Sequence, residues 1–202
     1  MKRFRITIIA VCIILAWLAY TDLSLYLRNP EPLTISITEL EANGVPREWL
    51  RIDDGVQNLL QAINMSGTME ITSFLVPLKQ SKDDSKETRV WFETRDPEIL
   101  DLLKTYYFLL NTDKEREEFV QKNKNIFFAK RQCTGLTADS LVAESNQKKL
   151  TELLQAMNIP VAEDTIFISE GKQPFLWRGV FFAVISIAGL LRVGLTLVKK
   201  EE

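Results

Sequence analysis

The chain has 202 residues, with 25 Lys and Arg, 27 Asp and Glu, and no histidine. Apolar residues concentrate in two terminal stretches, and the segment between them, 29–174, has ordinary soluble composition with 24 acidic and 17 basic residues, a net charge of −7. This acidic balance disfavours nucleic acid and anionic lipid as partners of the central segment. The absence of histidine excludes the commonest general base and the commonest zinc ligand.

The first apolar stretch predicts a membrane-spanning helix at 6–27, preceded by a tail at 1–5. Its apolar core is short for a span of about 20 residues, but Leu23, Leu25 and Leu27 extend it. No pair of small residues follows the core at the spacing that signal-peptide cleavage requires. We therefore expect an uncleaved anchor and not a cleaved signal peptide.

The second apolar stretch predicts a membrane-spanning helix at 176–198, followed by a tail at 199–202. At 1.5 Å per residue this helix is about 34 Å long, enough to cross the hydrocarbon with some tilt. Arg192 is a charge inside it, close enough to the end for its side chain to snorkel to the headgroups. The alternative is an intramembrane charge that serves transport or a partner protein.

Basic flanks predict the orientation of both helices. Three basic residues precede the first helix, and Lys199 and Lys200 follow the second. Because positive residues stay on the cytoplasmic side, both termini are expected in the cytoplasm and the domain at 28–174 outside it. The sequence thus predicts a cell-membrane protein, in plan a bacterial inner-membrane protein, whose first partner is the lipid bilayer.

Two features suggest how the two helices pack. Asp22 and Arg178 should both lie near the outer membrane boundary, and we hypothesise an ion pair between them that lowers the cost of both charges. Small residues on one helix face allow close approach of a second helix. At 100° per residue, four small residues of the second helix share such a face: Gly179, Ala183, Ser186 and Gly194.

The central segment predicts an α+β extracytoplasmic domain with a mixed sheet of five or six strands and interspersed helices, flanked by the two transmembrane helices. Alternating or β-rich runs predict strands at 33–37, 48–52, 69–76, 88–94, 125–133 and 164–169. Helical spacing predicts helices at 38–44, 56–64, 97–110, 113–123 and 145–158. Asp96 and Thr112 are expected to cap the third and fourth of these helices.

The sequence contains no strong motif for catalysis or for metal or cofactor binding. Asp53-Asp54-Gly55 is predicted as a turn, because the residues after it do not supply calcium ligands. Nucleophile elbows and phosphate loops are absent from the sequence, and Cys12 and Cys133 are expected to be separate buried thiols. Tyr106, Tyr107 and Phe108 are predicted as core, with one face open to a partner. No catalytic, metal-binding or cofactor-binding residues are therefore predicted.

The leading functional hypothesis is a non-enzymatic membrane protein whose external domain binds another membrane or envelope protein, or supports envelope assembly. One alternative is an envelope hydrolase that uses carboxylates without histidine, since such residues meet only in the fold. Another is an accessory subunit of a membrane transporter, with Arg192 and the small-residue face as the contact. The oligomeric state is left open.

Overall fold

The structure, a computed structural model, describes residues 2–65, 71–81, 88–137 and 161–198. It divides into two compact units. The first unit combines the two ends of the chain, 1–30 and 174–202, and the second is the domain between them, 31–173. The helix predicted at 145–158 lies outside the described residues.

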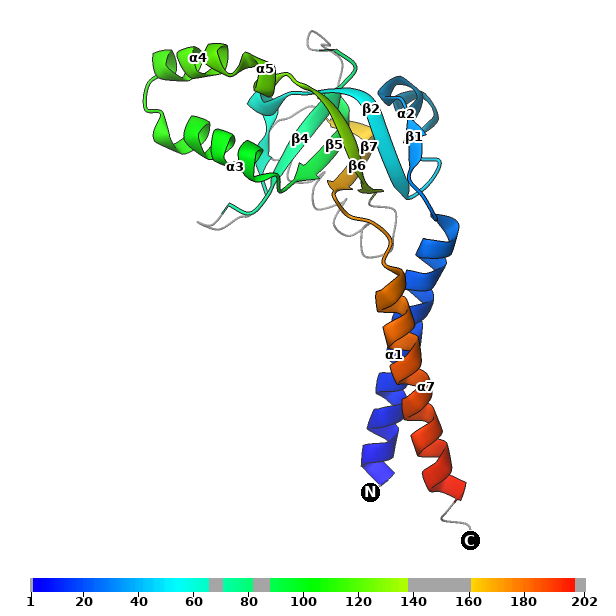
Figure 1. The fold of residues 1–202 in the computed structure, drawn as a ribbon. Helices are drawn as coiled ribbons and strands as arrows, with labels where there is room; N and C mark the ends of the chain where they lie inside the picture. The colour runs from blue at the N-terminus through cyan, green and yellow to red at the C-terminus, as the bar shows by residue number, and fades with distance from the viewer. Residues whose placement is uncertain (1, 66–70, 82–87, 138–160, 199–202) are drawn as a thin grey trace. The chain divides into compact units, whose positions relative to one another are not determined.

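The first unit is a pair of antiparallel helices, α1 (Lys2–Arg28) and α7 (Leu176–Val198), whose free ends lie together (Figure 1). Both are long and apolar enough to cross a membrane. The side chain of Asn29 donates a hydrogen bond of 2.9 Å to the carbonyl of Leu25, and Pro30 follows. Because proline cannot continue the hydrogen-bonded ladder, α1 ends there.

The second unit is an α+β domain, as predicted, but in its described residues the sheet has seven strands and not five or six. In chain order it contains β1 (Leu33–Ile35), α2 (Ile37–Asn43), β2 (Trp49–Gln57), the 3₁₀ turn η1 (Leu59–Gln61), β3 (Ile63–Asn64), β4 (Phe74–Lys79), β5 (Thr88–Thr94), α3 (Pro97–Lys104), the π-helical turn η2 (Thr105–Leu109), α4 (Asp113–Lys122), α5 (Lys124–Phe127), β6 (Lys130–Thr137) and β7 (Val161–Glu170).

Five of the strands close into a barrel. β2 pairs antiparallel with β6 and, at its far end, with β4. β4 is antiparallel to β5, β5 is parallel to β7, and β7 is antiparallel to β6, which completes the ring. Helices α3 to α5 are inserted between the third and fourth barrel strands (Figure 1). A five-stranded Greek-key barrel with this connectivity has the topology of the OB fold.

A bulge in β2 allows this strand to pair on both sides of the barrel. Its register with β6 shifts between Ile52 and Gly55. An extra residue bends and twists a strand, so that Val56 reaches Lys79 of β4. Gly55 is required at the bend because a Cβ there would overlap the side chain of Leu78.

Two predictions around this bulge are wrong. The expected turn at 53–55 is part of β2, and the carboxylate of Asp54 accepts a 2.8 Å hydrogen bond from the backbone N–H of Ile37 at the start of α2. The expected helix at 56–64 is instead the end of β2, the turn η1 and β3. Pairing of both strands with β4 outweighs the helical spacing of the apolar residues in this segment.

The strand predicted at 125–133 begins later than expected. Residues 124–127 form the short helix α5, and β6 starts at Lys130. Phe127 is fully buried, with its ring 5.5 Å from that of Tyr106 and 6.2 Å from that of Phe119. This aromatic packing against η2 and α4 stabilises the helical conformation of α5.

The barrel core forms because successive strand residues point to opposite faces. The first cluster fills the barrel and includes Phe74, Val76, Leu78, Val90, Phe92, Ile166 and Ile168, with Ile99, Leu103 and Phe127 of the inserted helices. The second cluster comprises Ile63, Leu75, Trp91 and Phe167, all buried. Both faces of β4 are therefore buried, which explains its nearly continuous apolar sequence.

The predicted helix starts at Asp96 and Thr112 are confirmed. The carboxylate of Asp96 accepts a 3.0 Å hydrogen bond from the backbone N–H of Glu98, and Pro97 occupies the first turn of α3. Thr112 and Glu115 form a reciprocal capping box at the start of α4. These caps fix where the two arms of the inserted helical segment begin.

Candidate functional site

Asp22 and Arg178 lie against each other within the helix pair. Arg178 of α7 donates two hydrogen bonds of 2.7 Å, one to each carboxylate oxygen of Asp22 of α1. The guanidinium carbon also lies 5.8 Å from the centre of the Phe175 ring. The structure thus brings together the two charges that the sequence suggested as partners, in the bidentate geometry that fixes a carboxylate most firmly.

The face of α7 that packs on α1 is lined by small residues. Gly179 and Ser186 are buried and Ala183 is half-buried. The Ser186 hydroxyl donates a 2.8 Å hydrogen bond to the carbonyl of Cys12. A Cβ on Gly189, a residue that the sequence interpretation missed, would lie 2.5 Å from the Cys12 sulfur. The two backbones approach closely because no larger side chain stands between them.

Gly194, by contrast, lies outside this contact face. It is exposed, and no atom lies within 4 Å of where its Cβ would be. The buried positions Gly179, Ser186 and Val193 recur every seven residues, the repeat of two helices wound around each other. A straight 3.6-residue wheel drifts by about 20° per heptad from that repeat. The sequence prediction used 3.6 residues per turn, and it therefore placed Gly194 on the contact face by mistake and did not include Gly189.

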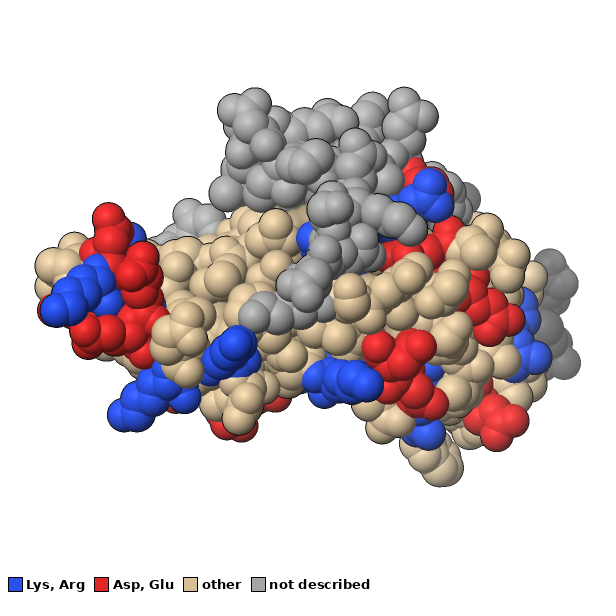
Figure 2. All heavy atoms as spheres, turned by 90° about the horizontal axis from the view of Figure 1, so that it is seen from above, with Lys and Arg blue, Asp and Glu red and all other residues tan. Residues whose placement is uncertain are grey.

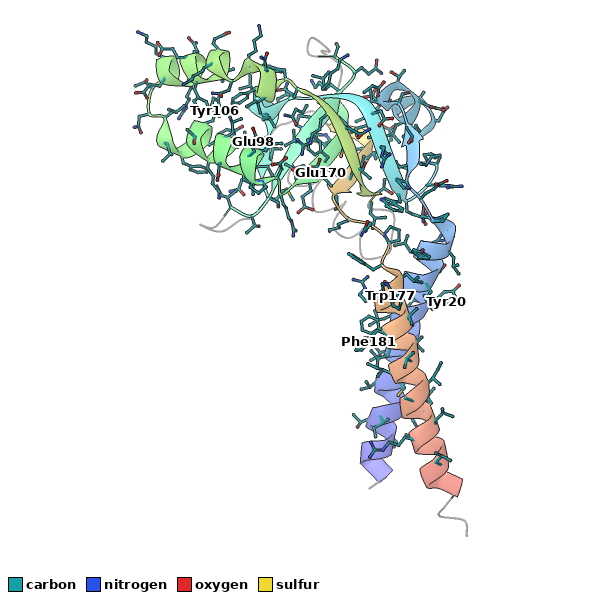
Figure 3. All side chains as sticks on the ribbon, in the orientation of Figure 1. Tyr20, Glu98, Tyr106, Glu170, Trp177 and Phe181 are labelled. Atoms are coloured by element: carbon teal, nitrogen blue, oxygen red, sulfur yellow. The ribbon has the colours of Figure 1, made fainter. Side chains whose placement is uncertain are left out.

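The outer surfaces of α1 and α7 are apolar and exposed. Tyr20 and Trp177 lie near each other along the pair, 69% and 80% exposed, with Phe181 further along α7 (Figure 3). Arg192 is exposed as well. Exposed apolar area of this extent is typical of surfaces that face lipid or an apolar partner. The other large exposed apolar residues of the pair include Ile6, Val11, Ile13, Ile14, Trp17, Val184, Ile187, Leu191 and Leu195.

In the domain, Arg131 of β6 joins three elements. Its guanidinium bonds both oxygens of Glu170 at the end of β7, at 2.8 and 2.9 Å, and Asp96 at the start of α3 at 3.1 Å. It also lies 5.4 Å from the centre of the Phe92 ring. The side chains of Arg131 and Glu170 are mostly buried, so this network holds the inserted helices to the barrel.

Several pKa values in the domain follow from these contacts. Burial acts to raise the pKa of Asp96, but the hydrogen bond and charge of Arg131 and the N–H of Glu98 outweigh it and lower that pKa. Backbone hydrogen bonds at the capping box lower the pKa of Glu115. Burial raises the pKa of the Cys133 thiol, which keeps it protonated and unreactive. A hydrolytic general acid needs a raised carboxyl pKa, the opposite of both carboxyl shifts.

Replacing Asp96 by asparagine is expected to reduce the acid sensitivity of the domain. Asparagine caps a helix as well as aspartate does, so Asp96→Asn removes the charge and keeps the cap. A carboxyl group with a lowered pKa in the folded state stabilises the fold at pH values above its unfolded-state pKa of about 3.9. This stabilisation is lost as the pH falls through the lowered folded-state pKa. Urea unfolding of the full chain in detergent between pH 7 and 2 measures the effect. Equal pH dependence in both proteins would contradict it.

The inserted segment forms a helical hairpin, with α3 and η2 as one arm and α4 as the other (Figure 1). Tyr107 anchors the first arm, since its hydroxyl donates a 3.0 Å hydrogen bond to the carbonyl of Ala62 and burial raises its pKa to about 12. The next residues, Phe108 and Leu109, are 60% and 68% exposed. The prediction that Phe108 belongs to the core is therefore wrong, because the first arm ends in an exposed apolar tip.

A groove of about 810 Å³ lies along α4 and faces η1 and η2. Figure 3 shows Tyr106 between the two arms, and Figure 2 shows acidic side chains gathered over α4 with basic ones among them. Its floor is apolar and its rim is charged. We call it the hairpin groove, and its lining residues are Leu60, Tyr106, Asp113, Arg116, Glu117, Glu118, Val120 and Gln121.

A smaller cavity, of about 280 Å³, is bounded by α2, β5 and β7. Its charges pair with one another: Arg89 donates a 3.0 Å hydrogen bond to the carbonyl of Glu41 and lies 3.5 Å from the carboxylate of Asp164. Within the described part of the chain, no three or more His, Cys, Asp or Glu side chains come together as a metal site would require.

Among the described residues, the hairpin groove and the outer faces of α1 and α7 are thus the candidate surfaces for a partner. Sequence periodicity identifies the helix faces, whereas the groove joins residues about 60 positions apart and has no local signal. No protein family, no curated protein and no solved structure matches the chain.

Proposed function

We propose that this chain is a two-pass membrane protein that holds a barrel domain outside the cytoplasm as a non-enzymatic binding module for another membrane or envelope protein. The observation that carries the membrane assignment is the exposed apolar surface of two antiparallel helices at opposite ends of the chain. The 20-residue apolar length of α7 corresponds to about 30 Å, the thickness of the hydrocarbon core.

Aromatic and charged residues support the orientation. Tyr20 and Trp177 belong at one headgroup level, where amphipathic rings prefer to lie, and the Asp22–Arg178 pair neutralises two charges near that level. The basic flanks at the opposite end of the helix pair belong in the cytoplasm. The domain of 31–173 then lies on the external side.

Protein binding is supported by the hairpin tip. Small barrels of the OB type bind ligands on the face of their second and third strands, which here are β4 and β5. In this chain the outward residues Leu75 and Trp91 of those strands are about 1% exposed. Phe108 and Leu109 instead expose apolar area on the inserted hairpin, and exposed contiguous apolar residues mark protein contacts.

The test is purification of the full chain from native membranes in a mild detergent. We expect it to elute with a second protein, and we expect the double variant Phe108→Ser, Leu109→Ser to lose that partner, with affinity reduced at least about tenfold. The matched control, Lys114→Ser with Lys122→Ser on the same hairpin, should keep the partner. A chain that purifies alone and monomeric would contradict the proposal.

Arg192 favours a second candidate function, an accessory subunit of a membrane transporter. It is an exposed charge in an apolar helix, one position before the buried Val193, and an intramembrane charge is usually paired within a larger assembly. Reversal of this charge by Arg192→Glu should then abolish assembly with the transporter. Unchanged assembly would exclude this second function.

A further inference from the structure

The hairpin groove combines an open apolar floor with an acidic rim. Tyr106 and Val120 contribute apolar surface while they pack against the main core, and Leu60 is 38% exposed. The rim carries the carboxylates of Asp113, Glu117 and Glu118. A groove of this size is within the range of natural ligand sites, and its walls offer both apolar and ionic contacts.

Helix α4 presents its carboxylates along the groove because of its spacing. Asp113, Glu117, Val120 and Gln121 follow the i, i+4, i+7, i+8 pattern of one helix face. None of the ten residues of α4 is buried. A helix with so little buried surface gains little stability from its own domain, and a bound partner would bury the face that it leaves open.

Arg116 is the basic residue that lines the groove, and it donates a 3.2 Å hydrogen bond to the carbonyl of Leu110. Its guanidinium lies 3.9 Å from Asp113, but the Asp113 side chain is almost fully exposed, so this ion pair is weak. Lys114 lies 3.9 Å from Glu118, but both side chains are largely exposed, so that pair is weak and exchangeable. The rim therefore keeps a net negative potential, which favours cationic ligands.

We propose that the hairpin groove binds a cationic amphipathic helix of a partner protein. This inference rests on the proposed binding function. An apolar side chain of the partner packs over Tyr106, and Lys or Arg side chains meet the rim carboxylates. Helix-in-groove recognition uses anchors at i, i+3, i+4 and i+7. The ten residues of α4 extend about 15 Å, which matches a partner helix of roughly three turns.

Site-specific photocrosslinking in native membranes tests this occupant. The probe residue replaces Gln121 in the groove, with Lys122 as the matched control on the opposite side of α4 and Phe108 at the exposed tip. We expect the Gln121 probe to capture a protein segment rich in Lys and Arg with apolar residues at helical spacing, identified by mass spectrometry. The Lys122 probe should not capture that segment.

The other outcomes overturn the inference in distinguishable ways. Capture by the Phe108 probe with none by the Gln121 probe would leave the binding function intact and remove the groove as its site. Capture of lipid, of a second copy of this chain, or of an acidic or uncharged segment at Gln121 would exclude the cationic helix. Capture of no protein by any probe would contradict the binding function as well.

A synthetic peptide of the captured segment supplies the charge test. The full chain in detergent should bind it about fivefold more weakly after Glu117→Lys, and the loss should shrink at high salt. The matched reversal Asp101→Lys, on the exposed side of α3 outside the groove, should leave affinity unchanged. Equal affinities for the two variants would overturn the role of the acidic rim.

Discussion

Replacement of Gly135 by alanine is expected to destabilise the barrel by about 3 kcal/mol or more. Gly135 lies in β6 opposite Glu170 of β7, and a Cβ at this position would overlap the backbone carbonyl of Ser169. A backbone atom within a ladder cannot move aside without loss of its hydrogen bonds. Urea unfolding of the full chain in detergent, followed by tryptophan fluorescence, measures the change in the free energy of unfolding.

Gly44 provides the matched control for this steric effect. It has a φ of 74° with open space around its Cβ position, so Gly44→Ala introduces backbone strain of about 1 kcal/mol and no clash. Similar unfolding free energies for the Gly135→Ala and Gly44→Ala variants would contradict the β6–β7 pairing and, with it, the closed barrel.

Local signals in the sequence predicted part of this barrel domain and not its closure. Asp96 and Thr112 identified helix starts because capping involves residues two or three positions apart. The turn η1 and strand β3 were missed because their structure depends on pairing with β4, about ten residues further along. The closed ring itself requires β2 to pair with β6, about 80 residues away. It also requires a bulge at Gly55, where no Cβ can fit beside Leu78, and no local sequence pattern indicates this.

Replacement of Gly189 by leucine is expected to separate α1 from α7, whereas the same change at Gly194 is not. The leucine at 189 would press on the buried Cys12 sulfur, 2.5 Å from the new Cβ. Overpacking of a close contact costs about 1–3 kcal/mol. The leucine at 194 meets no atom within 4 Å and only enlarges an exposed apolar surface.

Spin labels at Tyr20→Cys and Trp177→Cys, exposed positions on the two helices, report the interhelical distance. We expect a longer and broader distance distribution for Gly189→Leu and an unchanged one for Gly194→Leu. The reverse result would place the contact on the straight helical face predicted from the sequence. Unchanged distances in both variants would show that close packing at Gly189 does not hold the pair together.

For the helix pair, the sequence predicts the Asp22–Arg178 contact but only part of the face on which the two helices pack. Asp22 and Arg178 could be related because two spans of similar length place their outer ends at one level. The contact face could not be followed over its whole length, because two helices that wind around each other shift the repeat from 3.6 to 3.5 residues. The error accumulates along α7 and becomes visible at Gly194, fifteen residues after Gly179.

Labelling with a membrane-impermeant maleimide in intact cells tests the two-pass arrangement most directly. A cysteine introduced at Lys114, whose side chain is 84% exposed, should react without permeabilisation, and one introduced at Glu202 should react only after it. The native Cys12 and Cys133 are buried and provide a low background. Labelling at Glu202 in intact cells, or protection at Lys114, would contradict a domain held outside the cytoplasm by two spans.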